Sequence, residues 1–195
     1  MQSSDAIEAL MPVVTELERL GVRYYLCGSV ASAFYGVSRS TVDVDLVAEL
    51  APRHVAPLVQ ALEGRYYVDA RMILDAIARK SCFNVIYLPA NFKVDVFVAK
   101  TRPYDRAAMA RIREDAFDEA PGLPRVFLPS PEDVVLSKLE WFRLGDEVSQ
   151  RQWDDVLKVM KVASRSLDRS YMETWASELG VADLLARAWK EVEGQ

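Results

Sequence analysis

The fold is decided by one stretch, Leu26-Cys-Gly-Ser-Val-Ala-Ser-Ala-Phe-Tyr-Gly-Val-Ser-Arg-Ser-Thr-Val-Asp-Val-Asp-Leu46. It places a Gly-Ser turn a short helix ahead of two aspartates, Asp43 and Asp45, that are separated by a single valine. Successive side chains of a strand point to opposite faces, so both aspartates share one face. Their Cα atoms then lie roughly 6.6 Å apart, a span that carboxylate oxygens bridge with one or two hard cations.

A third aspartate stands in a second apolar stretch, Phe92-Lys-Val-Asp-Val-Phe-Val98. Apolar strands normally exclude carboxylates, because a buried unpaired charge is costly. If the two stretches form neighbouring strands, Asp95 converges on Asp43 and Asp45, and like charges that close raise one another's pKa. A bound Mg²⁺ or Mn²⁺ relieves that repulsion. The sequence therefore predicts a divalent metal site made of these three aspartates.

The aspartates also have a structural explanation that needs no metal. Aspartates at strand ends often cap a following helix or bond to a nearby arginine, and Arg39 is close in sequence. A lone Asp-x-Asp favours that explanation, since short motifs carry a high risk of false positives. The Gly-Ser turn before the pair and the third aspartate after it favour the metal site.

The Gly-Ser turn is a candidate phosphate-binding element. Gly28 ends the apolar stretch that starts at Tyr24, and glycine permits a tight turn and a close backbone approach to a phosphate. Ser29 is then the expected N-cap of a helix over residues 30–35, whose free N–H groups and dipole attract anions. A plain strand-to-helix connection is the alternative for the same residues.

Hydrophobic periodicity predicts a mixed α/β (α+β) sheet flanked by helices. A first helix is expected over residues 4–20, and residues 83–88 and 92–99 read as a hairpin because a short Pro-Ala-Asn link joins them. The remaining expected elements are strands over residues 24–27, 42–47 and 125–128 and helices over residues 53–62 and 71–80.

The chain turns helical after residue 128. Ser130, Pro131 and Asp133 form a helix start with a cap, a proline in the first turn and an acidic residue three positions after the cap. Lys138 follows within this helix, and its pattern leaves two possibilities: it points inward, or it pairs on the surface with Glu140 or Asp133. We expect an α/β domain over residues 1–128 and, packed on it, a C-terminal helical bundle over residues 129–195.

Composition restricts the function classes. The 195 residues, 51% of them hydrophobic and 27% charged, are typical of a soluble globular chain, and no apolar run is long enough to span a bilayer. Cys27 and Cys82 stand in apolar stretches without metal-ligand spacing, so buried free thiols in a reducing cytoplasm are expected.

The charge pattern leaves nucleic-acid binding as a weaker alternative. The net charge of −5 counts against a dedicated nucleic-acid binder. Arg102, Arg106 and Arg113 would roughly share one face if they lay on a single helix, and that face could meet a phosphate backbone. A solvated helix surface, balanced by neighbouring acidic residues, is the commoner outcome of such a pattern.

Two groups of motifs resemble the nucleotidyltransferase superfamily of polymerase-beta-like enzymes. The first is Gly28-Ser29 with Ala31, Tyr35-Gly36, Arg39, Thr41 and Asp43-x-Asp45. The second is Pro129-Ser-Pro-Glu-Asp-Val-Val-Leu-Ser-Lys-Leu-Glu140 followed by Arg151-Gln-Trp-Asp-Asp-Val-Leu157. This second half is similar to the C-terminal motifs of the AbiEii-like branch of bacterial toxins and minimal nucleotidyltransferases. The resemblance runs from about Tyr24 to Leu185.

The resemblance implies roles for the matching residues. It implies metal ligation by Asp43, Asp45 and Asp95, with catalysis by these aspartates and Lys138. It implies nucleotide binding by the following set: Gly28, Ser29, Arg39, Lys138 and Asp155. Whether Asp154 or Asp155 is the last acidic position stays open. Many members carry Gly-Gly where this chain has Gly28-Ser29.

The implied activity is Mg²⁺- or Mn²⁺-dependent transfer of a nucleoside monophosphate from an NTP such as ATP to a hydroxyl group. An RNA or tRNA 3′ end, a protein and a small molecule are all possible acceptors. The branch implies the toxin of a toxin–antitoxin system, with a cognate antitoxin as partner, although toxin members often have Lys-Asp where Trp153-Asp154 stands. The alternative is a catalytically silent member that binds a protein partner or RNA.

Overall fold

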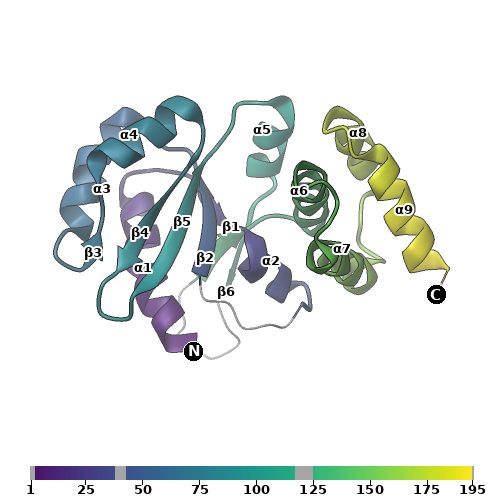
Figure 1. Cartoon of the computed structure of the whole chain (residues 1–195), viewed down its shortest axis with the longest axis horizontal. Helices are drawn as coiled ribbons and strands as arrows, with labels where there is room; N and C mark the ends of the chain where they lie inside the picture. The colour runs from purple at the N-terminus through teal and green to yellow at the C-terminus, as the bar shows by residue number, and fades with distance from the viewer. Residues whose placement is uncertain (1–2, 38–42, 117–124, 195) are drawn as a thin grey trace.

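A mixed five-stranded sheet lies between two layers of helices in the computed structural model, which describes residues 3–37, 43–116 and 125–194 (Figure 1). The strands of the sheet, in their spatial order, are β1 (Tyr24–Leu26), β2 (Asp43–Ala48), β5 (Phe92–Val98), β4 (Cys82–Tyr87) and β3 (Tyr66–Tyr67). The predicted mixed sheet is confirmed.

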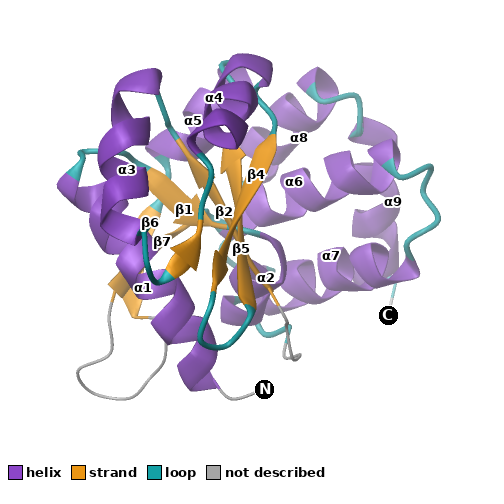
Figure 2. Cartoon of the chain, turned by 60° about the vertical axis from the view of Figure 1, so that its left-hand side comes forward, coloured by secondary structure: helices purple, strands orange, loops and turns teal. Residues whose placement is uncertain are grey.

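Figure 2 shows the helices of the two layers from a second side. Those of the first half are α1 (Ser3–Arg19), α2 (Gly28–Phe34), the short 3₁₀ turn η1 (Pro52–His54), α3 (Val55–Leu62), α4 (Ala70–Arg79) and α5 (Pro103–Ala110). The C-terminal helices are α6 (Pro131–Leu144), α7 (Gln150–Ala163), α8 (Arg169–Glu178) and α9 (Ala182–Glu193). The first layer holds α1, α3 and α4, and the second holds α2, α5 and the C-terminal helices α6 to α9. A two-stranded sheet of β6 (Arg113–Ala116) and β7 (Arg125–Leu128) packs beside β1.

The pairing of β2 with β5 is the only parallel pair within the described sheet. Its register sets Asp45 opposite Asp95 and Asp43 opposite Lys93. Burial alternates along both strands: Val44 and its apolar neighbours are buried, and the aspartates are only half-buried. The predicted alternation is confirmed, and the antiparallel pairing of β4 with β5 confirms the hairpin. One face of the sheet is therefore apolar and the other carries the carboxylates.

Two hydrophobic clusters hold the layers together. The first joins the apolar face of the sheet to α1, α3 and α4. The second lies among α6 to α9 and also takes in Ala31, Val37 and Tyr104 from the first half of the chain. The C-terminal helices therefore share their core with α2 and α5, and the division into 1–128 and 129–195 stays a prediction.

The expected arginine face is wrong. Helix α5 ends at Ala110, so Arg113 lies in β6 and not on the helix. Arg102 precedes α5 and makes ion pairs with Asp105 and Glu140. A helix over the whole segment fails because β6 pairs with β7, and backbone pairing of this kind depends on residues far apart in the sequence.

The structure also bears on the expectations about membrane-spanning segments and about the two cysteines. The described part of the chain holds no helix long and apolar enough to cross a membrane. Both cysteines are free thiols, but Cys82 is exposed and not buried as expected, because it begins β4 on the open side of the sheet. Cys27 is partly buried at the end of β1.

We predict that Leu139→Ala, in the middle of the second cluster, lowers the free energy of unfolding by about 2–5 kcal/mol. Leu139 is fully buried in α6, so the truncation leaves a cavity that the neighbouring helices fill only in part. Urea denaturation measures the loss. Leu144→Ala is the matched control, because Leu144 ends the same helix and is 63% exposed. Equal losses for the two variants would contradict this packing.

Candidate functional site

The turn after β1 brings the backbone against Asp45. The Cys27 N–H donates to the Asp45 carbonyl oxygen at 2.8 Å, which extends the β1–β2 pairing by one residue. Gly28 then takes a φ of +60°, in the left-handed region that glycine adopts without steric cost. A Cβ at this position would overlap the Asp45 Oδ2 atom and lie 2.9 Å from Asp45 Cγ. Only glycine therefore fits here without moving the carboxylate.

Ser29 is not the cap of the following helix. Helix α2 begins at Gly28, and its N-cap is Cys27, whose side chain makes no capping hydrogen bond. The predicted N-cap role of Ser29 is wrong, because the helix starts earlier: the Cys27 carbonyl oxygen already accepts from the Ala31 N–H at 3.3 Å. Ser29 is buried in the first turn. Arg39, the other residue expected near the nucleotide, lies outside the described residues.

The three predicted metal ligands share the open face of the sheet. Asp45 and Asp95 are cross-strand neighbours, and Asp43 stands two residues before Asp45 on the same face. The Lys93 ammonium lies among them, with its Nζ 2.7 Å from Asp95 Oδ2 and 4.0 Å from Asp43 Oδ2. The three aspartates therefore share one face of the sheet, with a cation among them that the sequence did not single out.

The donor atoms suit a hard divalent cation, since carboxylate oxygens are the ligands that Mg²⁺ and Mn²⁺ prefer. Yet over residues 3–37, 43–116 and 125–194 no group of three or more His, Cys, Asp and Glu side chains is arranged so that it could hold a metal ion. The side chains of Asp43, Asp45 and Asp95 would have to turn toward a common point. Metal ligation by them stays a prediction.

The environment of Asp45 disfavours the charged form of its carboxyl. Burial, as the largest cause, and the charges of Asp43 and Asp95 together raise the pKa of its carboxyl to about 6. Lys93 and Lys138 act in the opposite direction. The charged form of this carboxyl is therefore disfavoured in the protein without a bound cation.

Lys138 points inward and pairs with Asp155. The Lys138 Nζ lies 2.9 Å from Asp155 Oδ2, and both side chains are buried between α6 and α7. Of the two possibilities left by the sequence, the inward one is therefore correct. Asp154 instead lies on the exposed side of α7, where it accepts a hydrogen bond from Gln150. The geometry favours Asp155 as the acidic partner, and its role in nucleotide binding stays a prediction.

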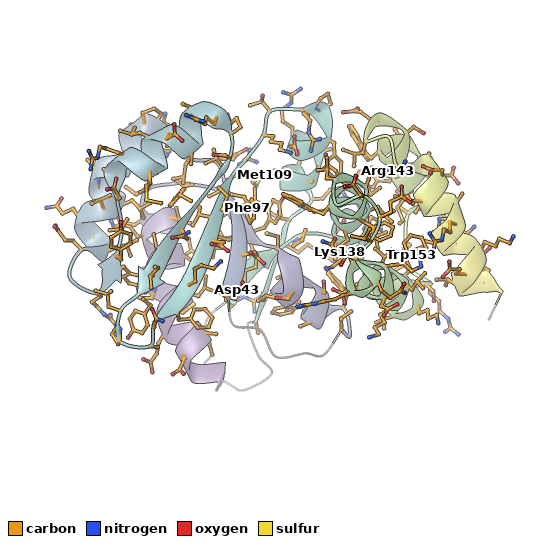
Figure 3. All side chains as sticks on the ribbon, viewed as in Figure 1. Asp43, Phe97, Met109, Lys138, Arg143 and Trp153 are labelled. Carbon is orange, nitrogen blue, oxygen red and sulfur yellow. The ribbon has the colours of Figure 1, made fainter. Side chains whose placement is uncertain are left out.

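A pocket of about 380 Å³ opens between the sheet and helices α6 and α7. Figure 3 shows Asp43 and Phe97 on the sheet facing Lys138 across the region between the two halves. The pocket brings together five of the predicted site residues: Gly28, Ser29, Asp45, Lys138 and Asp155. Asp43 and Asp95 lie on the same face of the sheet but outside its lining.

Sequence reasoning missed the aromatic wall of this pocket. The Phe97 and Trp141 rings meet edge to face at 6.1 Å, and Trp141 is 50% exposed. Two signals were available: Trp141 stands three residues after Lys138 on the same helix, and Phe97 stands two after Asp95 on the same strand. Both spacings place the aromatic residue on the face of the predicted site residue.

The fold of the chain is found in known proteins. The chain is similar to the solution structure of the antibiotic-resistance factor ANT(2'')-Ia, with 15% identity and a TM-score of 0.56 over 99% of this chain and 97% of that one. The chain has the nucleotidyltransferase fold. A crystal structure of ANT(2'')-Ia with adenylyl-2''-tobramycin matches with 19% identity and a TM-score of 0.54 over 89% of this chain and 95% of that one.

A third nucleotidyltransferase fold supports the same conclusion. A nucleotidyltransferase-like antigenic protein from Paracoccidioides brasiliensis matches with 18% identity and a TM-score of 0.52, over 96% of this chain and 94% of that one. Neither a protein-family model nor a curated protein matches the sequence. The likeness at these identities concerns the fold, and placement in the AbiEii-like branch stays a prediction.

We predict that Gly28→Ala lowers the free energy of unfolding by more than Gly21→Ala does. Both glycines have a left-handed φ, +60° and +67°, so each substitution costs about 1–2 kcal/mol for the backbone conformation alone. A Cβ at Gly21 meets nothing within 4 Å, whereas a Cβ at Gly28 displaces the Asp45 carboxylate. Urea denaturation of the pair isolates the displacement, and equal losses would contradict the close approach.

The raised pKa of Asp45 predicts a pH dependence of stability in EDTA. Its folded pKa of about 6 lies above the roughly 3.9 of an unfolded aspartate. The folded state therefore binds the extra proton, and the stabilisation is complete below pH 4 and is lost as the pH rises through 6. Measured by urea denaturation, the wild type should lose stability relative to Asp45→Asn between about pH 4 and 6. A constant difference would contradict the raised pKa.

Proposed function

We propose that the chain is a divalent-metal-dependent nucleotidyltransferase that moves a nucleoside monophosphate from an NTP to the hydroxyl of a small molecule. The observation that carries the proposal is the setting of Asp45. This carboxylate faces Asp95 across the parallel pair, lies under the Gly28 turn and borders a pocket that also holds Lys138. The transfer needs carboxylates for the metal, a backbone turn and a lysine for the phosphates, and space for the acceptor. All of these lie together around Asp45.

Asp43, Asp45 and Asp95 would hold the metal, Mg²⁺ or Mn²⁺, through their carboxylate oxygens. When bound, the metal supplies positive charge to the phosphate oxygens whose negative charge grows during an in-line displacement. The raised pKa of Asp45 supports this assignment, because a carboxylate crowded by Asp43 and Asp95 favours a cation in its place.

The turn and α6 are the proposed phosphate-binding elements. Gly28 leaves the backbone of the turn open to close approach, and Ser29 lines the same pocket. Lys138 contributes an ammonium from the opposite wall, and Asp155 fixes its position at 2.9 Å. Held in this way, Lys138 meets the negative charge of the triphosphate without having to order a flexible side chain. Arg39 is proposed to assist at the nucleotide.

The reaction itself needs a base and a leaving group. The acceptor hydroxyl gives its proton to the Asp95 carboxylate, and its oxygen forms a bond to the α-phosphorus of the NTP. The bond between the α-phosphorus and the bridging oxygen breaks, and pyrophosphate leaves with that electron pair. Lys138 offsets the negative charge on the phosphates during this displacement. The products are the nucleotidylated acceptor and pyrophosphate, so atoms and charges balance.

A small molecule is the acceptor that the site favours. The pocket of about 380 Å³ lies in the size range of small-molecule sites, and its Phe97–Trp141 wall suits the packing of a ring. The ANT(2'')-Ia structure holds an adenylylated tobramycin, which makes ATP the proposed donor here. The net charge of −5 counts against an RNA acceptor.

A toxin that acts in the cytoplasm beside a cognate antitoxin is the second candidate. It rests on one observation: the two motifs that resemble the AbiEii-like branch bring Lys138 and Asp155 into contact. A catalytically silent binder of a protein or RNA is the remaining alternative. The acceptor class decides between these functions.

We predict transfer of label from an α-labelled NTP when the protein is incubated with Mg²⁺ and a cell lysate divided into small-molecule, RNA and protein fractions. Wild type should label the small-molecule fraction, and Asp45→Asn should reduce the rate by at least about 100-fold, since a lost interaction of about 2.7 kcal/mol or more with the reacting charge has that effect. Thin-layer chromatography and gels measure the label in each fraction.

Asp75→Asn is the control, because Asp75 is an exposed carboxylate on α4, in the helix layer that packs against the opposite face of the sheet. It should keep full activity. Label in RNA or in one protein would replace the small-molecule acceptor and favour the toxin. No label with any NTP and no binding of Mg²⁺–NTP by calorimetry would contradict the enzyme and favour the silent partner.

A further inference from the structure

Lys93 is the residue of the open face that the proposed function leaves unexplained. It stands opposite Asp43 in the parallel register and two residues before Asp95, so its side chain leaves the sheet between the two aspartates. The ammonium makes a short ion pair of 2.7 Å with Asp95 and lies 4.0 Å from Asp43. A single positive charge therefore sits beside two of the three proposed metal ligands.

The burial of the two partners differs. The Asp95 side chain is 15% exposed, whereas that of Lys93 is 43% exposed. Asp95 is fixed by the sheet, but Lys93 reaches it from a flexible four-carbon stem with water on one side. Turning the ammonium out into water costs little, because a partly exposed ion pair contributes little to stability. The ion pair between Lys93 and Asp95 therefore forms in the metal-free protein, and a competing cation can displace the ammonium at a small cost in free energy.

We propose that Lys93 is an internal counter-ion that a divalent metal must displace from Asp95. This inference rests on the proposed function, since it assumes that the metal binds to Asp43, Asp45 and Asp95. In the metal-free protein the Lys93 ammonium offsets the repulsion among these carboxylates. A divalent cation and the ammonium compete for the same Asp95 oxygen, so Lys93 lowers the affinity for metal and stabilises the empty site.

The exchange also governs the proposed base. The ion pair with Lys93 occupies Asp95 Oδ2, one of the two oxygens of the proposed base. Exchange passes that oxygen from Lys93 to the cation, so one positive charge or the other holds Asp95. Lys93 is in these terms a positioning residue and not a catalytic one.

The first test uses Mn²⁺ alone as the probe, without nucleotide, and electron paramagnetic resonance to count free and bound ions. Lys93→Met keeps the length of the stem and removes the charge. It should bind Mn²⁺ roughly 30-fold more tightly than the wild type, as expected when one unit charge about 4 Å from a divalent cation is removed in a water-like medium. Lys100→Met is the matched control: Lys100 is exposed just after β5, and its loss should leave the affinity unchanged.

A second variant assigns the effect to Asp95. In an Asp95→Asn background the oxygen for which the two cations compete no longer carries charge, so adding Lys93→Met should improve Mn²⁺ affinity by a clearly smaller factor. In EDTA, Lys93→Met should also have a lower Tm than Lys100→Met, and Mn²⁺ should raise the Tm of Lys93→Met by the larger amount. This readout is independent of catalysis.

Three outcomes would overturn the proposal. Equal or weaker Mn²⁺ binding by Lys93→Met, with binding intact in the wild type, rejects the exchange and leaves the metal site standing. An unchanged gain in the Asp95→Asn background shows that Lys93 acts elsewhere on the surface. Lack of Mn²⁺ binding by the wild type, Lys93→Met and Lys100→Met alike rejects the metal site itself, and the exchange with it.

Discussion

The parallel hydrogen bonding between β2 and β5 is the constraint on which the site depends. It sets Asp45 directly opposite Asp95, and with them Asp43 opposite Lys93. Because side chains alternate along a strand, a slip of one residue would move one strand's charged residues into the apolar core. The core of α1, α3 and α4 prevents that slip, since it needs the buried valines of both strands. Hydrophobic burial on one face thus fixes the charges on the other.

The two lysines of the site are held very differently. Lys138 is buried with Asp155 between two helices, where separating the pair would leave an uncompensated charge in a medium of low dielectric constant. Lys93 pairs with Asp95 at a partly exposed position, where water can solvate the ammonium when the pair separates. The first lysine is therefore a fixed part of the pocket, and the second is exchangeable.

The pocket is positioned by packing between the two halves of the chain. Ala31 of α2 belongs to the same hydrophobic cluster as the C-terminal helices, and the Tyr35 hydroxyl donates to the Pro129 carbonyl oxygen at 2.7 Å. These contacts tie the helix that follows the Gly28 turn to the start of α6, on which Lys138 lies. The distance between the turn and the lysine is therefore set by one continuous core.

Local patterns in the sequence determined the sheet face, the hairpin and the Ser130 cap of α6, because alternation and capping depend on residues close in the chain. They also brought Gly28 and Asp45 forward as site residues, whereas a site role for Lys138 was implied only by the resemblance to nucleotidyltransferases. They failed for Arg113, which a distant partner draws into a strand, and for Ser29, whose helix starts earlier. Only the tertiary structure decided which carboxylate meets which lysine, because an ion pair across two elements depends on register and packing that no local spacing encodes.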